Sequence, residues 1–231
     1  MQRDAWALDE FFHSARLPAC ARGPCCLSEP MKPGWIGTAL LLSSVTSAWA
    51  GDIPPPTIGT NPGRDFDVTF ATGVLFGLRN RNHYVTVPNI VTLRCYLLRT
   101  EWFGGQLRVE QWLGASLIAT AILRGPESHY FGIALASGTR LRQPGSRWSF
   151  QFDALGGVGA IDSRGVPEGQ GQDFTITAIG RMSVNYDVTH RLTISGGAIY
   201  QHFSNAGLSE PKVRNTGLDT IGPGFSVGYR F

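Results

Sequence analysis

Long runs in which apolar and polar residues alternate are the feature that most constrains how this chain can fold. The clearest runs cover residues 66–77, 148–159, 174–186 and 220–231. Alternation with a period of two predicts β-strand, because successive side chains of a strand point to opposite faces. Runs of ten or more residues also exceed the about 5–6 residues of a typical strand in a soluble protein. The sequence therefore predicts long strands with one apolar and one polar face.

A segment near the N-terminus has the layout of a secretory signal peptide. Residues 31–50 read MKPGWIGTALLLSSVTSAWA, with one lysine, an apolar run and a small-residue ending at Ala48-Trp49-Ala50. This order predicts export and cleavage after Ala50. Residues 1–30 carry acidic residues that suit neither a signal nor an anchor, so we expect an upstream extension outside the fold. The alternative, a soluble domain with an apolar helix near its start, is disfavoured by the small-residue ending.

The expected mature region, residues 51–231, holds enough strands for one barrel. Weaker alternation occurs near residues 84–97, 105–121, 128–140 and 191–204, which brings the total to eight strands. Dividing these 181 residues by eight gives about 23 per strand with its connection. That length suits tilted membrane strands of about 9–11 residues that extend beyond the bilayer. The longest apolar run, Leu113 to Leu123, is far shorter than the roughly 20 residues of a membrane-spanning helix.

Together these features predict an all-β fold, an eight-stranded antiparallel up-and-down transmembrane β-barrel of the outer-membrane type. Short connections such as RQPGSR and YDVTHR occur beside longer ones such as DSRGVPEGQGQD, as in outer-membrane barrels. The apolar faces would meet lipid and the polar faces would point inward, where eight strands leave room only for side chains. The alternative is a lipocalin-like soluble barrel with its apolar face around a ligand.

The end of the chain indicates the compartment. Phe225, Val227, Tyr229 and Phe231 follow one another at steps of two up to the last residue. This pattern resembles the C-terminal signal by which bacterial outer-membrane proteins are recognised for insertion. We therefore expect the outer membrane of a Gram-negative bacterium.

Cysteine, histidine and charge patterns indicate neither a disulfide nor a cofactor. Cys95 is the single cysteine of residues 51–231, so this region cannot form an internal disulfide. Histidines and cysteines do not occur at the spacing of metal ligands, and we expect no metal or other cofactor. The formal net charge of +3 is spread without clear asymmetry, and we expect no nucleic-acid partner.

Two polar residues stand out on the lipid-facing side of the predicted strand 191–204. His202 and Ser204 follow Tyr200 on that face, and Asp219 lies on the same face of the next strand, across the hairpin. Two residues along a strand span about 6.6 Å, so neighbouring side chains on one face can meet. A hydroxyl, an imidazole and a carboxylate are the parts of a hydrolytic triad. Ser204 would be the nucleophile, His202 the general base and Asp219 the acid that orients the imidazole.

These residues resemble the PagL-type lipid A 3-O-deacylases. HFSNAGL, which begins at His202, matches the family's H-x-S-N-A-G motif, NTGLD matches its N-x-G-x-(E/D) element, and GYRF resembles its barrel-closing end. The resemblance implies that His202 and Ser204 are the catalytic pair, that Asp219 is the acid, and that Asn205 with the backbone at Gly207 stabilises the oxyanion. It also implies hydrolysis of the 3-position acyl ester of lipopolysaccharide lipid A in the outer leaflet, releasing a 3-hydroxy fatty acid.

Several alternatives stay open at this point. The family's best-known acid is glutamate, so Glu210, in the loop before Asp219, is a second candidate for that role. His202 and Ser204 could instead be a polar pair at the membrane boundary of a non-catalytic structural barrel. The same serine could serve a phospholipid hydrolase or acyltransferase, and a homodimer is compatible with the sequence.

Overall fold

The computed structural model describes residues 57–58, 66–78, 83–167, 169–208 and 217–231. The chain divides into two units, Met1–Gly51 and Asp52–Phe231, and every described residue belongs to the second. The predicted extension, the predicted signal peptide and Glu210 lie outside the described residues.

Regular structure in the described part of the chain consists of strands. They are β1 (Thr57–Ile58), β2 (Phe66–Gly73), β3 (Leu75–Gly77), β4 (Val85–Trp102), β5 (Leu107–Arg124), β6 (His129–Arg142), β7 (Trp148–Ile161), β8 (Phe174–Asp187), β9 (Leu192–Ser204) and β10 (Leu218–Arg230). None of the described segments is a helix long and apolar enough to span a membrane.

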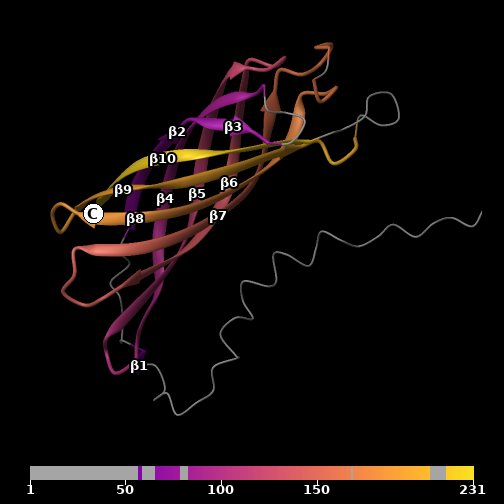
Figure 1. Cartoon of the computed structure of the whole chain (residues 1–231). Helices are drawn as coiled ribbons and strands as arrows, with labels where there is room; N and C mark the ends of the chain where they lie inside the picture. Colours follow the sequence, from indigo (N-terminus) through magenta and orange to yellow (C-terminus); the bar gives the residue numbers. More distant parts are fainter. Residues whose placement is uncertain (1–56, 59–65, 79–82, 168, 209–216) are drawn as a thin grey trace, which may run out of the picture. The chain divides into compact units, whose positions relative to one another are not determined.

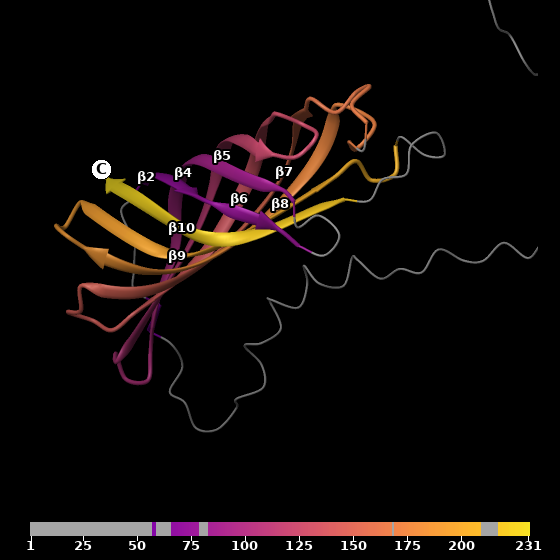
Figure 2. The ribbon, with the colours of Figure 1, turned by 45° about the horizontal axis from the view of Figure 1, so that its top comes forward.

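The strands close into a ring. From β4 to β10 each strand pairs antiparallel with the next, and β10 also pairs with β2 and β3, which in turn pair with β4. β2 and β3 act as one strand with a break at Val74, so the ring has eight strands, as predicted (Figures 1 and 2). The two-residue β1 pairs with the end of β4 and lies outside the predicted set.

The break between β2 and β3 lies where the ring closes. Val74 donates a backbone hydrogen bond of 3.2 Å to the carbonyl of Pro223 on β10. The two backbones approach closely, because a Cβ added to Gly222 would lie 2.0 Å from the Val74 carbonyl oxygen. A glycine in a strand commonly marks such an approach. The seam between the first and last strands therefore depends on a residue without a side chain.

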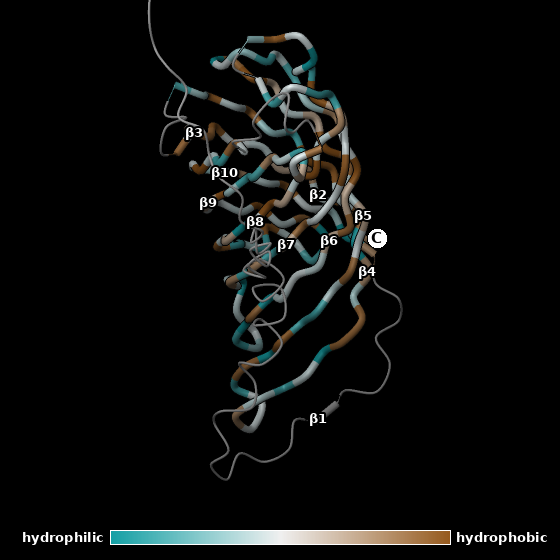
Figure 3. The backbone as a smooth tube through the Cα atoms, turned by 90° about the vertical axis from the view of Figure 1, so that its right-hand side faces the viewer, coloured by the Kyte–Doolittle hydropathy of each residue, from teal (hydrophilic) through white to brown (hydrophobic). Residues whose placement is uncertain are grey.

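Alternate side chains point into and out of the ring. Figure 3 shows hydrophobic and hydrophilic residues alternating along the strands. Outward residues such as Leu117, Ile133 and Leu135 are 60–78% exposed, which suits a lipid-facing surface. Polar residues such as Gln151 and Gln201 are buried inside, as the sequence predicts. Large aromatic residues also fill the interior, on faces that the alternation alone did not mark as aromatic: Tyr96, Trp112, Tyr130 and Phe203.

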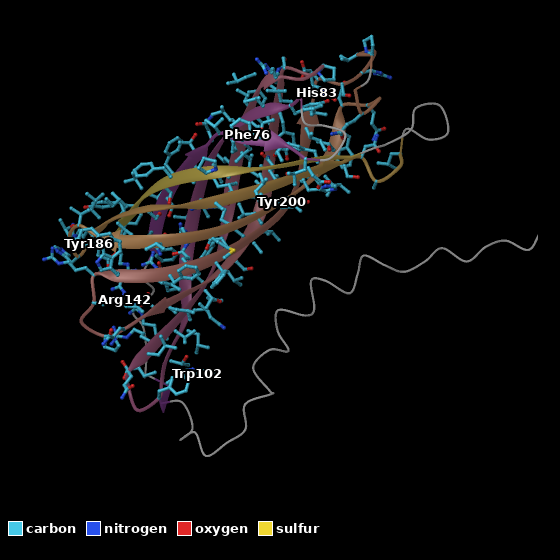
Figure 4. The ribbon with its side chains drawn as sticks, viewed as in Figure 1. Phe76, His83, Trp102, Arg142, Tyr186 and Tyr200 are labelled. Atoms are coloured by element: carbon cyan, nitrogen blue, oxygen red, sulfur yellow. The ribbon has the colours of Figure 1, made fainter. Side chains whose placement is uncertain are left out.

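The two ends of the ring differ in their connections. Short turns at residues 103–106, 143–147 and 188–191 share one end with the C-terminus, and the other end carries the two longest connections, 162–173 and 205–217. Figure 4 shows Arg142, Tyr186 and Trp102 toward the turn end and His83 and Phe76 toward the loop end. Short turns face the periplasm in outer-membrane barrels, so β9 runs outward and ends at the cell surface.

Candidate active site

His202 and Asp219 meet on the outer surface of the barrel. They are register partners across the β9–β10 ladder, and the imidazole Nδ1 lies 2.8 Å from Asp219 Oδ1. Their side chains are 32% and 25% exposed. The register thus brings together the two residues that strand alternation assigned to one face.

This contact determines which nitrogen of the His202 imidazole carries the proton. A carboxylate only accepts hydrogen bonds, so Nδ1 carries a proton and donates it to Asp219. The other ring nitrogen, Nε2, is then the basic one and can take a proton from a hydroxyl. A carboxylate in this position would also stabilise a positive charge on the ring.

Ser204 lies two residues beyond His202 on the same face, at the last position of β9. Its Oγ accepts a hydrogen bond of 3.2 Å from the backbone amide of Ala206. Two buried threonines of β8 hold the backbone of the pair from inside the barrel. Thr175 Oγ1 donates to the Ser204 carbonyl at 3.0 Å, and Thr177 Oγ1 donates to the His202 carbonyl at 3.1 Å. Hydrogen bonds from interior side chains therefore hold the part of β9 that carries His202 and Ser204.

Asn205 points into the barrel. It is fully buried, its Nδ2 donates to the Gln170 carbonyl at 2.7 Å, and its Oδ1 accepts from the Gly207 amide at 3.0 Å. In this structure both groups expected to stabilise the oxyanion are thus bonded to each other. The side chain of Asn205 fixes the turn that follows Ser204.

That turn has an unusual backbone. Ala206 has φ 54° and Gly207 has φ 77°, which are two successive left-handed residues. Positive φ is uncommon for a residue with a Cβ and costs energy unless the surroundings require it. Here the Ala206 amide is directed at Ser204 Oγ, and the Leu208 amide closes the turn on the Asn205 carbonyl at 3.1 Å. The strained conformation aims a backbone donor at the serine.

A buried carboxylate that the sequence did not reveal lies behind this turn. Glu127, 3% exposed, accepts hydrogen bonds from the Tyr84 hydroxyl at 2.5 Å, the Ser163 hydroxyl at 3.2 Å and the Gln170 amide at 3.1 Å. Because Gln170 in turn accepts from Asn205, these bonds connect the loops at the outer end of the barrel to the residue after Ser204. Glu127 lies in a connection, where strand alternation gives no information about burial.

Tyr200 also has a role that alternation did not indicate. The sequence placed it as an interfacial aromatic on the outer face, and Figure 4 shows it on the outside of the barrel wall. Its hydroxyl donates to Asp219 Oδ1 at 2.5 Å, the same oxygen that His202 contacts. Asp219 therefore receives two side-chain donors from β9.

The surroundings of the site are apolar. Ile176, the β8 register partner of Ser204, is 40% exposed, and Leu208 and Phe76 are 63% and 51% exposed. Within the described ranges no three His, Cys, Asp or Glu residues gather as metal ligands would.

The chain is similar to one known protein family and to two solved structures. A protein-family model described as Lipid A 3-O-deacylase (PagL) matches residues 96–230, more than half of the chain. The crystal structure of Neisserial surface protein A matches with a TM-score of 0.50 and 12% identity, covering 72% of this chain and 97% of that one. That of the outer membrane enzyme PagL matches with a TM-score of 0.46 and 19% identity, covering 69% and 97%. No curated protein sequence matches the chain.

Proposed function

Because this chain belongs to the lipid A 3-O-deacylase (PagL) family, we propose that it is a serine esterase that hydrolyses the acyl ester at the 3-position of lipid A. The product would be a 3-hydroxy fatty acid. The observation that carries this proposal is the contact between His202 and Asp219 on the outer face of an outer-membrane barrel, two residues from Ser204.

The proposed reaction has two stages. His202 Nε2 takes the proton of Ser204 while Oγ attacks the ester carbonyl carbon. The bond between that carbon and the sugar oxygen then breaks, and His202 gives its proton to the leaving oxygen. In the second stage His202 takes a proton from water, which attacks the acyl-serine, and the fatty acid leaves as Ser204 recovers its proton.

The oxyanion of each stage needs positioned donors. The Ala206 amide, 3.2 Å from Ser204 Oγ, is the donor that the geometry favours. Asn205 would contribute by holding the turn rather than by its side-chain amide, because that amide donates to the Gln170 carbonyl inside the barrel. The Gly207 amide would join the oxyanion site only after it leaves Asn205 Oδ1.

The location supports a membrane lipid as the substrate. The exposed apolar side chains around the site, including Ile176, Leu208 and Phe76, would contact acyl chains, and the site faces outward at the end of β9. Lipopolysaccharide occupies the outer leaflet of the outer membrane in Gram-negative bacteria.

We also propose export by the signal in residues 31–50, which the intact mass of the purified barrel would test.

Mass spectrometry of lipid A tests the activity. Cells expressing the wild-type protein should lose one 3-hydroxyacyl group from lipid A, and cells expressing Ser204→Ala should not. Ser137→Ala is the matched control, since Ser137 is an exposed outward serine on β6, and it should behave as wild type. Unchanged lipid A with a folded barrel in the outer membrane would overturn the proposal, and loss of a glycerophospholipid chain instead would identify a phospholipase.

A further inference from the structure

A second polar site lies inside the barrel at the turn end, far along β9 from Ser204. It is a cavity of about 240 Å³ lined by inward residues of β2, β4, β6, β8, β9 and β10. Such a volume holds roughly eight waters. Its lining includes five arginines: Arg94, Arg140, Arg142, Arg191 and Arg230. Figure 4 shows Arg142 at this end of the barrel, near Tyr186.

The two carboxylates of the cavity are already engaged. Asp67 accepts from the Tyr96 hydroxyl at 2.8 Å and pairs with Arg94 at 3.5 Å. Asp187 accepts from the Thr193 hydroxyl at 2.7 Å and pairs with Arg142. Each aspartate thus neutralises one arginine through one oxygen and accepts a hydrogen bond from a hydroxyl group through the other.

Two other interior carboxylates have closer arginine partners of their own. Glu110 pairs with Arg99 at 3.1 Å, and Asp153 pairs with Arg181 at 3.7 Å. Neither acid lines the cavity. The paired carboxylates near the cavity each have an arginine of their own.

Three arginines of the cavity form no ion pair within 4 Å with any described carboxylate, and Asp67 and Glu110 attract one of them, Arg230, only from a longer distance. Arg140 Nε donates to Gln151 at 3.1 Å, Arg191 donates to the Tyr229 hydroxyl at 3.3 Å, and Arg230 lies 4.8 Å from the Tyr96 ring centroid. Among the residues that the structure describes, no carboxylate lies within 4 Å of their nitrogens in an ion pair. Arginine stays protonated in proteins, and the five arginines of the lining outnumber its two aspartates by three.

We propose that this cavity binds a phosphate-type oxyanion. Guanidinium groups present planar pairs of donors that match phosphate oxygens, and an anion would offset the cost of gathering unpaired charges in a partly buried space. The anion would come either from free inorganic phosphate in the periplasm or from the phosphate of an anionic phospholipid headgroup in the inner leaflet. This binding is separate from lipid A hydrolysis and does not depend on it.

The test measures binding of inorganic phosphate to the full chain folded in neutral detergent. Thermal unfolding is followed in phosphate and in chloride at equal ionic strength, and ³¹P NMR titration gives the dissociation constant. We expect a saturable rise of the unfolding midpoint for the wild type, since a ligand that binds the folded state stabilises it. Arg140→Gln and Arg191→Gln should weaken phosphate binding about tenfold or more, because each removes a charged hydrogen-bond donor.

Arg147→Gln is the matched control. Arg147 is an exposed arginine in the turn beside Arg142 and does not line the cavity, so this variant should bind phosphate as the wild type does. Arg140→Gln could fail to fold. In that case phosphate binding is tested by Arg191→Gln, whose substitution lies in a turn, and by the ³¹P titration of the wild type. The Ser204→Ala variant should bind phosphate normally, which separates this result from the outcome for the esterase.

Nanodiscs distinguish the two sources of the anion. Stabilisation in phosphatidylglycerol but not in phosphatidylcholine, with no free phosphate present, would identify a lipid headgroup as the ligand. Stabilisation by inorganic phosphate alone would identify the free anion. An equal response of the wild type and all arginine variants would show a general salt effect and overturn the proposal, as would the lack of any response to either source.

Discussion

Gly217 lies against the edge of the His202 ring: a Cβ built on this glycine would stand 3.3 Å from the ring atom Cε1. Its φ of 60° is left-handed, a conformation that costs other residues about 1–2 kcal/mol. Gly217→Ala is therefore expected to shift the imidazole and lower kcat for lipid A more than it raises KM. Gly180→Ala is the control, because a Cβ there meets nothing within 4 Å. Equal activity of the two variants would show that Gly217 has no influence on the ring.

The acid of the site is tested by its charge. Asp219→Asn keeps the shape of the side chain but removes the negative charge and adds a donor, so the side chain no longer fixes the imidazole tautomer, and activity should fall by a factor on the order of 10⁴. Asp219→Glu retains a carboxylate and should keep part of the activity. Glu210→Gln should have only a slight effect. Deacylation rates in detergent micelles would give the ranking, and a larger loss for Glu210→Gln would reassign the acid.

Tyr200→Phe removes the second donor to Asp219 and leaves the ring in place. A hydrogen bond to a charged group contributes about 1.5–3 kcal/mol to stability, so we expect a lower unfolding midpoint together with a clear decrease in kcat. Tyr186→Phe provides the control at the opposite end of the barrel, where the hydroxyl accepts from Arg147 at 3.5 Å. Should both variants keep full activity, Tyr200 would be an interfacial aromatic only.

Glu127→Gln should loosen the outer loops. The neutral amide is a weaker acceptor than the carboxylate that Tyr84, Ser163 and Gln170 contact, and charged hydrogen bonds are roughly twice as strong as neutral ones. We expect slower labelling of Ser204 by a fluorophosphonate and faster proteolysis of residues 162–173. Glu101→Gln, which changes a half-buried carboxylate paired with Arg108, should leave both the labelling and the proteolysis unchanged. Unaltered labelling in Glu127→Gln would show that the hydrogen bonds of Glu127 do not affect the reactivity of Ser204.

The segment near residue 128, which is hydrogen-bonded to Asp162, should lose stability in acid. Partial burial would raise the pKa of this carboxyl, but hydrogen bonds from the Ser128 hydroxyl and from the amides of His129 and Ser128 outweigh it and hold the pKa below its ordinary value of 3.8. A lowered folded-state pKa stabilises the fold above the ordinary value, and this contribution is lost as pH falls through the folded pKa. The protection of amides near residue 128, measured as the ratio of the intrinsic to the observed exchange rate, should therefore fall below about pH 4 in the wild type. Asp162→Asn should show low protection at every pH, and a pH dependence of protection equal to that of the wild type would contradict this origin.

The alternation of apolar and polar residues made the strands more predictable than the loops. The face of Asp219 followed from Ile221 and Phe225, because apolar residues at steps of two fix the orientation of the whole strand. Trp112 and Tyr130 were harder to place, since an eight-stranded barrel fills its narrow interior with large side chains whatever their polarity. Asn205 and Glu127 lie beyond strand ends, where orientation depends on turns and distant partners. Their burial could be seen only after the loops were brought together in space.

The closure of the ring by β10 has a consequence for when the site becomes complete. Asp219 is held by β9 on one edge, and on the other its carbonyl accepts the amide of Leu78, just after β3, at 2.8 Å. Before the first and last strands meet, one edge of the strand that carries the acid is open. A partly assembled chain therefore presents its serine without a fully supported acid. The pairing that closes the barrel is therefore also the step that completes the backbone support of Asp219.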